Sequence, residues 1–494
     1  MTSLLLIPLL TSIACYPVRN ARLIGYVSLA GSIALAAAAF PVIAASLEQP
    51  LGASGGMFYM DALSGYVMAI VIFLSLASSG YSISYLKHEL ASGLTDLRGM
   101  RRYYSLFHFF VLTMLLVTMG NNLAVMWIAI EATTIVSALL IGLGFYKRPL
   151  AVEAAWKYII LCTVGITFAL LGTFIAYYAS TTAMGEGGTL NWTVLRAEAA
   201  RLNPGTMKLA FIFVLVGYGT KAGLAPMHNW LPDAHSQAPS PISALLSGIL
   251  LNTAFYGIMR FVSIVEPSTG GGFTGGLLIT FGLISMGISA IFILVQDNYK
   301  RLLAYSSIEH MGIISLGAGI GGPVAIYGSL LHILNHAIAK PLMFFASGKL
   351  QSRFGSTRIE SVSGVLTSMP LLGAVTLIGA LSLSGTPPFN IFVSEFTVLK
   401  AAFDGGHWVT AGFFLLFVVM VFYGVLSGFG KMLFGPAVEP VGSGTHGQAH
   451  PAGGSVMSMS VMAVLAALVV VLGVTVPSFL DNAIKSCVVA LGVK

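Results

Sequence analysis

Residues 219–233 read Gly219-Thr-Lys-Ala-Gly-Leu-Ala-Pro-Met-His-Asn-Trp-Leu-Pro-Asp233, and this stretch decides the fold. Lys221, Pro226 and Pro232 stand where an apolar membrane helix should continue. A proline lacks the backbone donor and clashes with the preceding turn, so these two prolines predict a broken helix. In a bilayer the freed carbonyls need partners in the protein or in water, which favours an enclosed, hydrated cavity. We expect Lys221 to act as a charge carrier there; a kinked helix whose lysine reaches the membrane surface is the alternative.

The composition is that of a polytopic helical membrane protein. Hydrophobic residues make up 56% of the 494 residues and charged residues only 8%, and the mean hydropathy is +0.90. The net charge of +7 comes from basic residues scattered over short loops, which argues against a nucleic-acid partner. Three cysteines lie far apart without metal-ligand spacing, so we expect no disulfide framework, metal site or redox centre in this chain: Cys15, Cys162 and Cys487.

Fourteen apolar segments are predicted to form helical spans. The first covers residues 1–16 and has no basic residue ahead of it, unlike a secretory signal. The others lie near residues 23–46, 62–85, 104–119, 122–145, 156–179, 208–231, 240–264, 273–295, 301–321, 323–348, 366–403, 408–431 and 456–478.

These spans group into four regions. We expect three N-terminal helices in residues 1–100, a first repeat of helices 4 to 8 in residues 101–266, and a second repeat of helices 9 to 13 in residues 267–435. A linker and helix 14 follow in residues 436–494. Because residues 436–455 are rich in Gly, Pro, Ser and His, we interpret His446 and His450 as solvated loop residues rather than metal ligands.

Basic residues are distributed unevenly over the predicted loops. The loops after odd-numbered spans hold fourteen lysines and arginines, whereas the even-numbered loops and the C-terminal end hold five. The positive-inside rule therefore places the odd-numbered loops in the cytoplasm and both termini on the outer side. We expect a multi-pass protein of a prokaryotic cytoplasmic (inner) membrane.

Eight charged residues fall in or at the edges of predicted spans: Lys157, Lys221, Arg260, Lys340, Lys400, Glu131, Glu309 and Glu395. At roughly 3 kcal/mol for each charge near the bilayer centre they would cost roughly 24 kcal/mol, more than the roughly 5–15 kcal/mol net stability of a typical domain. Some must therefore be neutral, paired or hydrated. Neutral and paired ionisable groups are what a proton relay requires.

His332, His336 and Lys340 are each four residues apart, so they share one helix face over about 12 Å. Such a stripe, bridged by water, could pass protons along the membrane plane. A zinc site, for which no third local ligand is evident, and histidines bonded within a packed core are the alternatives. Glu153 and Lys157 are also four apart near a helix start, where a surface pair and an intake gate both fit the spacing.

A weak internal repeat relates the two halves of the chain. Three sets of residues in the first half recur in the same order in the second. Ile130-Glu131, Ile135 and Ser137 correspond to Ile308-Glu309, Ile313 and Ser315, and Ala154 and Lys157 correspond to Ala337 and Lys340. Gly223, Pro226 and Asp233 correspond to Gly385, Pro388 and Glu395. The order predicts two five-helix units of opposite orientation, with breaks in helices 7 and 12. Inverted repeats that carry broken helices indicate a transport path near the bilayer midplane.

A resemblance to a known family rests on four stretches: Trp127-Ile-Ala-Ile-Glu-Ala-Thr-Thr134, Ala155-Trp-Lys-Tyr158, residues 219–243 and Ala304-Tyr-Ser-Ser-Ile-Glu309. The chain resembles the antiporter-like subunits shared by respiratory complex I, multi-subunit cation/proton antiporters and group 4 hydrogenases. These stretches are specifically similar to component F of the hydrogenase-4 type. The resemblance covers nearly the whole chain and implies an all-α polytopic membrane fold with about 14 helices.

The resemblance also implies partners. Other antiporter-like and small membrane subunits would flank the chain in the lipid bilayer, and peripheral hydrogenase-like or dehydrogenase-like subunits would dock on it. Nickel–iron and iron–sulfur centres or a quinone would belong to those partners. No cofactor and no catalytic residue are expected in this chain.

The family's proton-carrying residues have counterparts here. By resemblance they are Glu131 and Lys221 in the first half, the central groups His332, His336 and Lys340, and Glu395 on the twelfth span. Secondary candidates on the path are Glu153, Lys157, His228, Asp233, Asn252, Glu309 and Lys400. Asn252 departs from the pattern, because complex I relatives commonly carry a lysine there. An asparagine binds water but holds no exchangeable charge.

The function we expect is proton translocation coupled to redox chemistry in partner subunits. Glu131 would pair with Lys221 until a charge change in a neighbouring subunit weakens the pair, and the released proton would pass along the central stripe to Glu395. A sodium/proton antiporter, a stand-alone solute carrier and a passive membrane anchor are the alternatives. The glycine run 317–322 lies in an apolar span, which indicates close helix packing rather than nucleotide binding.

Overall fold

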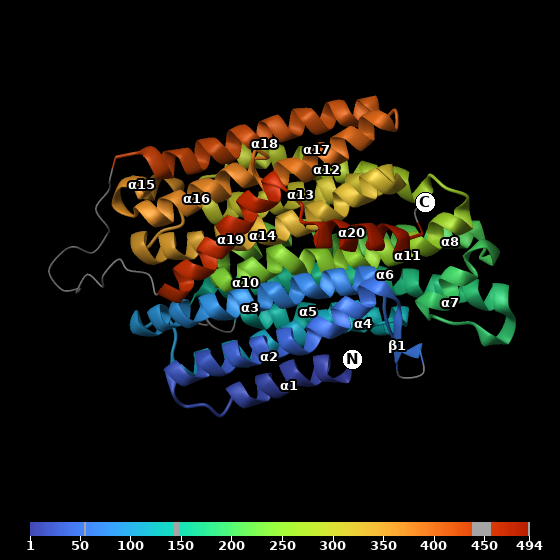
Figure 1. Ribbon diagram of the computed structural model, residues 1–494, viewed down its shortest axis with the longest axis horizontal. Coiled ribbons are helices and arrows are strands. Elements are labelled where there is room, and N and C mark those ends of the chain that lie inside the picture. The colour runs from blue at the N-terminus through green and yellow to red at the C-terminus, as the bar shows by residue number, and fades with distance from the viewer. Residues whose placement is uncertain (54–55, 143–147, 437–455, 493–494) are drawn as a thin grey trace.

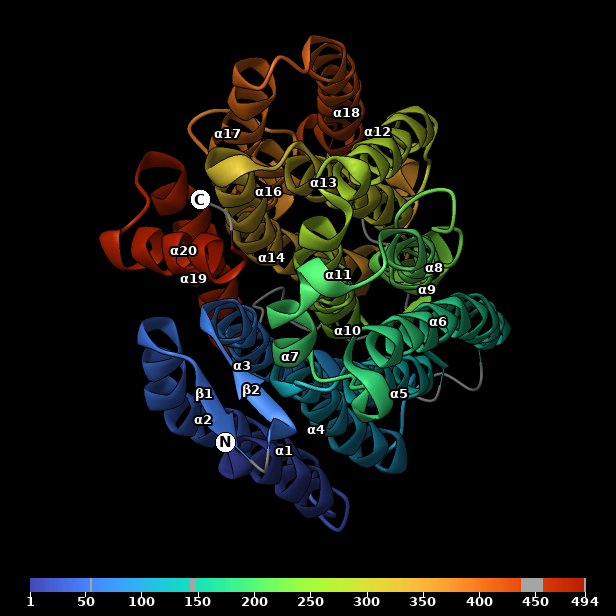
Figure 2. The same cartoon turned by 90° about the vertical axis from the view of Figure 1, so that its right-hand side faces the viewer.

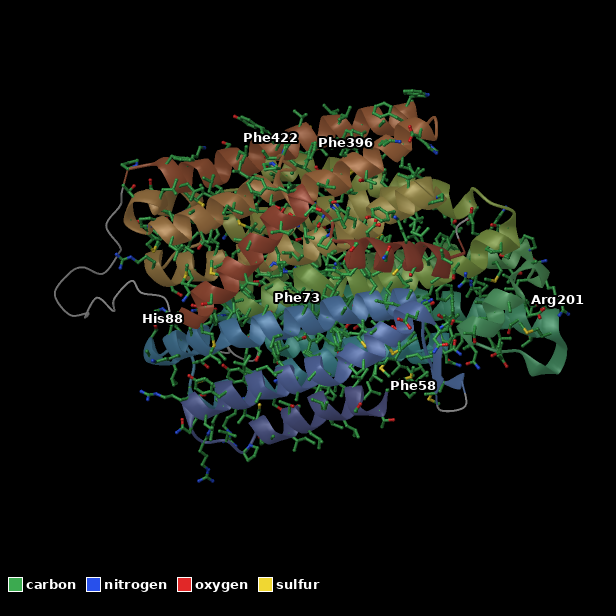
Figure 3. All side chains as sticks on the ribbon, in the orientation of Figure 1. Phe58, Phe73, His88, Arg201, Phe396 and Phe422 are labelled. Carbon is green, nitrogen blue, oxygen red and sulfur yellow. The ribbon has the colours of Figure 1, made fainter. Side chains whose placement is uncertain are left out.

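The computed structural model describes residues 1–53, 56–142, 148–436 and 456–492, and its helices run along one long axis (Figure 1). His88 marks one end of the bundle and Arg201 the opposite end (Figure 3). The predicted linker, with His446 and His450, lies almost wholly outside the described residues. Two short strands, β1 (Leu51–Ala53) and β2 (Phe58–Met60), pair antiparallel at the Arg201 end.

The first part of the chain forms α1 (Thr2–Cys15), α2 (Ala21–Glu48), α3 (Ala62–Ala91), α4 (Leu97–Met119), α5 (Leu123–Gly142), α6 (Pro149–Met184), α7 (Trp192–Ala197), α8 (Pro204–Ala222) and α9 (Trp230–Gln237). The remainder forms α10 (Ser240–Leu245), α11 (Leu251–Thr269), α12 (Phe273–Leu294), α13 (Tyr299–Ile320), α14 (Gly322–Phe354), α15 (Val365–Ser368), α16 (Pro370–Leu383), α17 (Asn390–Asp404), α18 (Trp408–Phe434), α19 (Val456–Val474) and α20 (Ser478–Ala490). Asparagine or aspartate side chains accept backbone N–H groups at several helix starts, which fixes where these helices begin: Asn20, Asp61, Asp96, Asn203 and Asn298.

The polytopic helical fold is confirmed. Each of the 14 predicted spans corresponds to a helix or to a broken pair of helices. Within the described residues, nine helices are long and apolar enough to cross a membrane, or ten when one bent pair is counted as a span. The number 14 and the division into four regions stay predictions.

Both predicted helix breaks are present. Residues 223–229 separate α8 from α9, and residues 384–389 separate α16 from α17. Gly223, with φ of +78°, adopts the left-handed conformation that glycine favours, and so ends α8. The Trp230 indole N–H donates to the Thr220 carbonyl at 2.8 Å. A carbonyl beside the first break thus has the internal partner that a membrane environment demands.

Seen along the bundle axis, α11, α13 and α14 lie in the middle (Figure 2). The helices α5, α6 and α8 lie on one side of them, and α12, α17 and α18 lie on another (Figure 2). A Cβ added at Gly319 would lie 2.8 Å from the Gly275 carbonyl oxygen, so the glycine run does pack closely, against α12. The helix α9 contacts α13, and α16 and α17 contact α14. Both breaks therefore face the central helices.

Candidate functional site

Lys221 lies in the last turn of α8 with its side chain fully buried. Its Nζ donates to Thr134 Oγ1 at 2.9 Å and to the Tyr158 hydroxyl. The Tyr158 hydroxyl also lies 2.7 Å from Ser137 Oγ. The ammonium stands 4.6 Å from the centroid of the Tyr158 ring, a cation–π distance. Each of these direct partners is uncharged.

A hydroxyl joins Glu131 to Lys221. Thr134 accepts from Lys221 and donates to Glu131 Oε2 at 3.2 Å, while Thr163 donates to Glu131 Oε1 at 2.9 Å. Glu131 is half-buried and Thr163 is exposed, so the carboxylate reaches the side of the bundle. The structure therefore links Glu131 and Lys221 through the Thr134 hydroxyl. The spacing of these residues in the sequence did not indicate this arrangement.

Glu153, Lys157 and Asp233 meet at the bundle surface. Lys157 Nζ lies 2.7 Å from the Glu153 carboxylate and 3.3 Å from that of Asp233, which also pairs with Arg301. About half of the Lys157 and Glu153 side chains is exposed, 49% and 55% respectively. The ion pair expected from the four-residue spacing is confirmed, and it is a surface pair. Its role as an intake gate stays a prediction.

The stripe of His332, His336 and Lys340 is fully buried on α14 and faces α13. His332 Nε2 lies 3.1 Å from His310 Nδ1, and the ring centroids of His336 and His310 are 5.3 Å apart. His310 belongs to α13 and is not among the predicted residues. The available signal was its place directly after Glu309, which was predicted to be buried.

Lys340 resembles Lys221 in having uncharged partners. Its Nζ donates to the Leu303 carbonyl at 2.9 Å and to Ser306 Oγ, both on α13. The side chain is fully buried. Because a carbonyl and a hydroxyl carry no net negative charge, neither partner fixes the lysine in its charged form as a carboxylate would.

Glu395 lies beside this axis. His332 Nδ1 is 2.9 Å from Ser394 Oγ. Since Ser394 directly precedes Glu395, this contact brings Glu395 close to the central histidines. Glu309, His310 and Glu395 bring potential ligand atoms within 4.8 Å of one another. Carboxylates and an imidazole are ligand types that divalent metal ions accept. We assign no metal to them, and the expectation that the chain holds none stays a prediction.

An asparagine pair fixes the second break against α14. Asn335 Nδ2 donates to the Asn390 carbonyl at 2.7 Å, and Asn390 Nδ2 donates to Asn335 Oδ1 at 3.3 Å. Ser382 donates to Asn390 Oδ1 at 2.8 Å from the other side of the break. These bonds tie the start of α17 to α14 and α16 and hold Glu395 near the central histidines. Neither asparagine could be predicted from the sequence, since their spacing follows no helical rule.

The remaining candidates lie in different surroundings. His228, in the first break, is 6% exposed. Asn252 Nδ2 donates to the Gly248 carbonyl at 2.8 Å, inside the π-helical segment Leu246–Leu250 that precedes α11. Asn252 therefore supports an irregular helical turn, a feature that is frequent at functional sites. Lys400 is exposed and pairs with the aspartate four residues later, so the structure does not bring it to the central groups.

Arg260 forms a buried ion pair that the sequence did not reveal. Two of its guanidinium nitrogens each lie 2.6 Å from an Asp61 oxygen, and both side chains are 4% exposed. The guanidinium stands 4.3 Å from the Trp192 ring centroid and 4.8 Å from that of Tyr256. Burial raises the pKa of Asp61 but the guanidinium lowers it, and the pKa lies below its ordinary value. This pair is satisfied and fits a structural role.

Two broken helices that pack against central helices, with buried lysines, histidines and carboxylates beside them, are the features of an antiporter-like membrane subunit. Residues 120–421 match the family described as NADH:quinone oxidoreductase/Mrp antiporter, TM, and the chain belongs to this family.

Relatives and a solved structure agree with this assignment. The chain is 40% identical over 350 residues to the hydrogenase-4 component F homolog of Methylacidiphilum infernorum, covering 71% of this chain and 73% of the relative. It is 31% identical over 358 residues to the NADH-quinone oxidoreductase subunit N of Desulforudis audaxviator, covering 71% and 67%. One chain of the archaeal membrane-bound sulfane sulfur reductase superposes with a TM-score of 0.84 at 24% identity, covering 98% and 96%. That last likeness shows the fold.

Proposed function

We propose that the chain translocates protons as a membrane subunit of a multi-subunit respiratory or hydrogenase-type oxidoreductase. One observation carries the proposal: Lys221 and Lys340 are fully buried, and within the described residues both amines donate hydrogen bonds to uncharged groups. A buried amine without a direct carboxylate partner can gain or lose a proton with no ion pair to break. The names of the relatives, a hydrogenase component and a quinone oxidoreductase subunit, support redox chemistry in partner subunits.

The proposed path leads from the first break to the second. Lys221 holds a proton while Thr134 connects it to Glu131. A charge change beside Glu131 favours release of that proton toward the central axis. Water and the buried histidines of α13 and α14 then carry it toward Glu395, since an imidazole can accept on one nitrogen and donate from the other.

Orientation and partners complete the proposal. We place the His88 end in the cytoplasm and the Arg201 end, with both termini, outside, as the loop charges predict. Exposing a charged carboxylate to lipid costs free energy. The half-buried Glu131 is therefore an argument that a neighbouring membrane subunit covers that side of the bundle. In this proposal the nickel–iron, iron–sulfur or quinone chemistry belongs to peripheral partners.

The test replaces Lys221 with methionine, which removes the titratable amine and keeps a long apolar side chain. In the purified complex in proteoliposomes we expect protons translocated per redox turnover to fall about tenfold, with turnover retained. Lys208→Met is the matched control, because Lys208 is an exposed lysine on the same helix. Undiminished proton translocation in Lys221→Met refutes the proposal, and transport that requires sodium favours the antiporter alternative.

A further inference from the structure

Buried polar atoms without hydrogen-bond partners lie at several positions between the His88 end and the central axis. Among the described residues they include Glu89 Oε2, Ser240 Oγ and both ring nitrogens of His235 and of His336. Buried polar groups are nearly always partnered, and those without a protein partner are usually bonded to internal water. These atoms therefore outline a hydrated route that the surface pair Glu153–Lys157 does not use.

Lys300 points into the bundle from a helix start. It is the second residue of α13, where a lysine can ordinarily extend to the membrane surface, yet its side chain is only 2% exposed. Its Nζ donates to the Ala238 carbonyl at 3.2 Å, in the turn between α9 and α10. The next residue, Arg301, instead pairs with Asp233 nearer the surface. Burying an amine where solvent is within reach is costly and indicates a functional reason.

Glu89 is a second buried ionisable group near the His88 end, within electrostatic range of Lys300. The side chain belongs to the last turns of α3 and is 6% exposed, while Lys87 two residues earlier is exposed. Lys300 and Arg148 are the cations that act electrostatically on the Glu89 carboxylate. A buried carboxylate at the end of the bundle, within electrostatic range of a buried amine, is placed to exchange a proton between solvent and the interior.

His235 connects this pair to the axis. It is fully buried on α9, its ring is stacked 5.3 Å from that of Phe344 on α14, and Lys300 and Lys340 both act on it electrostatically. His336 in turn interacts electrostatically with His235. On the other side, the ring of His235 lies 6.4 Å from that of Trp230, the residue that closes the first break.

We propose that Glu89 and Lys300 form the proton-uptake site, and that His235 passes the proton from them to the central axis. This inference rests on the proposed function. The Glu89 O–H bond breaks and, through water, an N–H bond forms on the neutral Lys300 amine. An N–H bond of the resulting ammonium then breaks as its proton passes through water to one ring nitrogen of His235, and the N–H bond on the other ring nitrogen breaks as that proton leaves toward His336. Glu89 takes up a proton from cytoplasmic water, so Glu89, Lys300 and His235 return to the protonation states in which they began.

Two variants test the uptake site in the intact complex in proteoliposomes. We expect Glu89→Gln and Lys300→Met each to lower protons per redox turnover about tenfold, a barrier increase of about 1.4 kcal/mol. The matched controls, Glu360→Gln and Lys87→Met, change exposed residues and should behave as the wild type. Glu89→Asp should restore most of the translocation, because it keeps a titratable carboxyl group.

The outcomes separate this inference from the proposed function. Wild-type translocation in Glu89→Gln and Lys300→Met, with Lys221→Met impaired, overturns the uptake site and leaves proton translocation standing. A loss confined to Glu153→Gln would place uptake at the surface pair instead. Wild-type translocation in all of them, Lys221→Met included, removes the proposed function as well.

A second measurement needs no variant. Hydroxyl-radical footprinting of the wild-type complex marks side chains that contact water. We expect His235 to be labelled and His108 to be protected, although both are buried histidines, because His108 Nε2 has a protein partner, Ser28 Oγ, at 2.8 Å. Equal protection of both histidines contradicts a hydrated route.

Discussion

Lys221 and Lys340 are both fully buried, but their surroundings differ in how completely the polar atoms are partnered. Around Lys221, the hydroxyls of Thr134, Tyr158 and Ser137 form one connected set of hydrogen bonds. Around Lys340, the neighbouring His336 has both ring nitrogens without a partner among the described residues. The first lysine is held in a fixed geometry, and the second borders groups that need water.

The same residue type therefore stands in two different environments in this chain, one with a closed set of hydrogen bonds and one beside unpartnered polar atoms. A closed set of hydrogen bonds in a low-dielectric region is costly to break, because a lost partner leaves a buried group unsatisfied. Where water is present it replaces a lost partner at small cost. Single substitutions should therefore be severe near Lys221 and mild along the central axis.

Tyr158→Phe should have the largest effect of the partner substitutions. It removes the hydroxyl that accepts a hydrogen bond from Lys221, so the amine loses one of its hydrogen-bond partners. At roughly 1–3 kcal/mol for an unsatisfied buried group, protons per turnover should fall about tenfold. The measurement is proton translocation against redox turnover in proteoliposomes. A loss below twofold would show that water already reaches Lys221, and the contrast between the two sites would be lost.

Ser306→Ala removes the corresponding hydroxyl from Lys340 and should cost less. The Leu303 carbonyl still accepts from Nζ at 2.9 Å, and water can take the place of the hydroxyl. We expect a loss of about threefold in the same assay, which is less than 1 kcal/mol. An effect as large as that of Tyr158→Phe would mean that the central axis is as dry as the first site.

Asn252→Ala should have a smaller effect still. It removes the amide that donates to the Gly248 carbonyl in the π-helical segment, and the amide oxygen that is lost with it has no partner among the described residues. We expect a loss of about twofold at most and little change in assembly. If translocation were abolished while the complex assembled, Asn252 would be part of the path rather than a support for the helix turn.

Lys400→Gln is expected to change least. Lys400 and its aspartate partner are 56% and 58% exposed, and exposed pairs contribute about 0–1 kcal/mol. Translocation and the thermal midpoint of the complex should both stay near wild type. A strong loss of translocation would return Lys400 to the path and require a neighbouring subunit to cover it.

Features that depend on local sequence could be predicted. The two helix breaks follow from glycines and prolines, whose backbone limits act within a few residues. The Glu153–Lys157 pair and the stripe on α14 follow from helical periodicity. Each of these features is determined by residues that lie within a few positions of it in the sequence.

Features that depend on packing between distant helices could not be predicted. His310 joins the histidines of α14 because α13 packs there, and no spacing rule relates the two helices. Lys300 stands among the loop charges in the sequence, and only the structure shows its amine turned inward. Asp61 and Arg260 are 199 residues apart, so their pairing is visible only in three dimensions.

The most direct test of the central claim, that the two buried lysines lie on one continuous proton path, is a double-mutant cycle in the intact complex. Lys221→Met, Lys340→Met and the double variant are compared by protons translocated per redox turnover. On a single serial path the double variant should translocate no less than the poorer single variant. Losses that multiply, or a single variant that pumps normally, would contradict one continuous path.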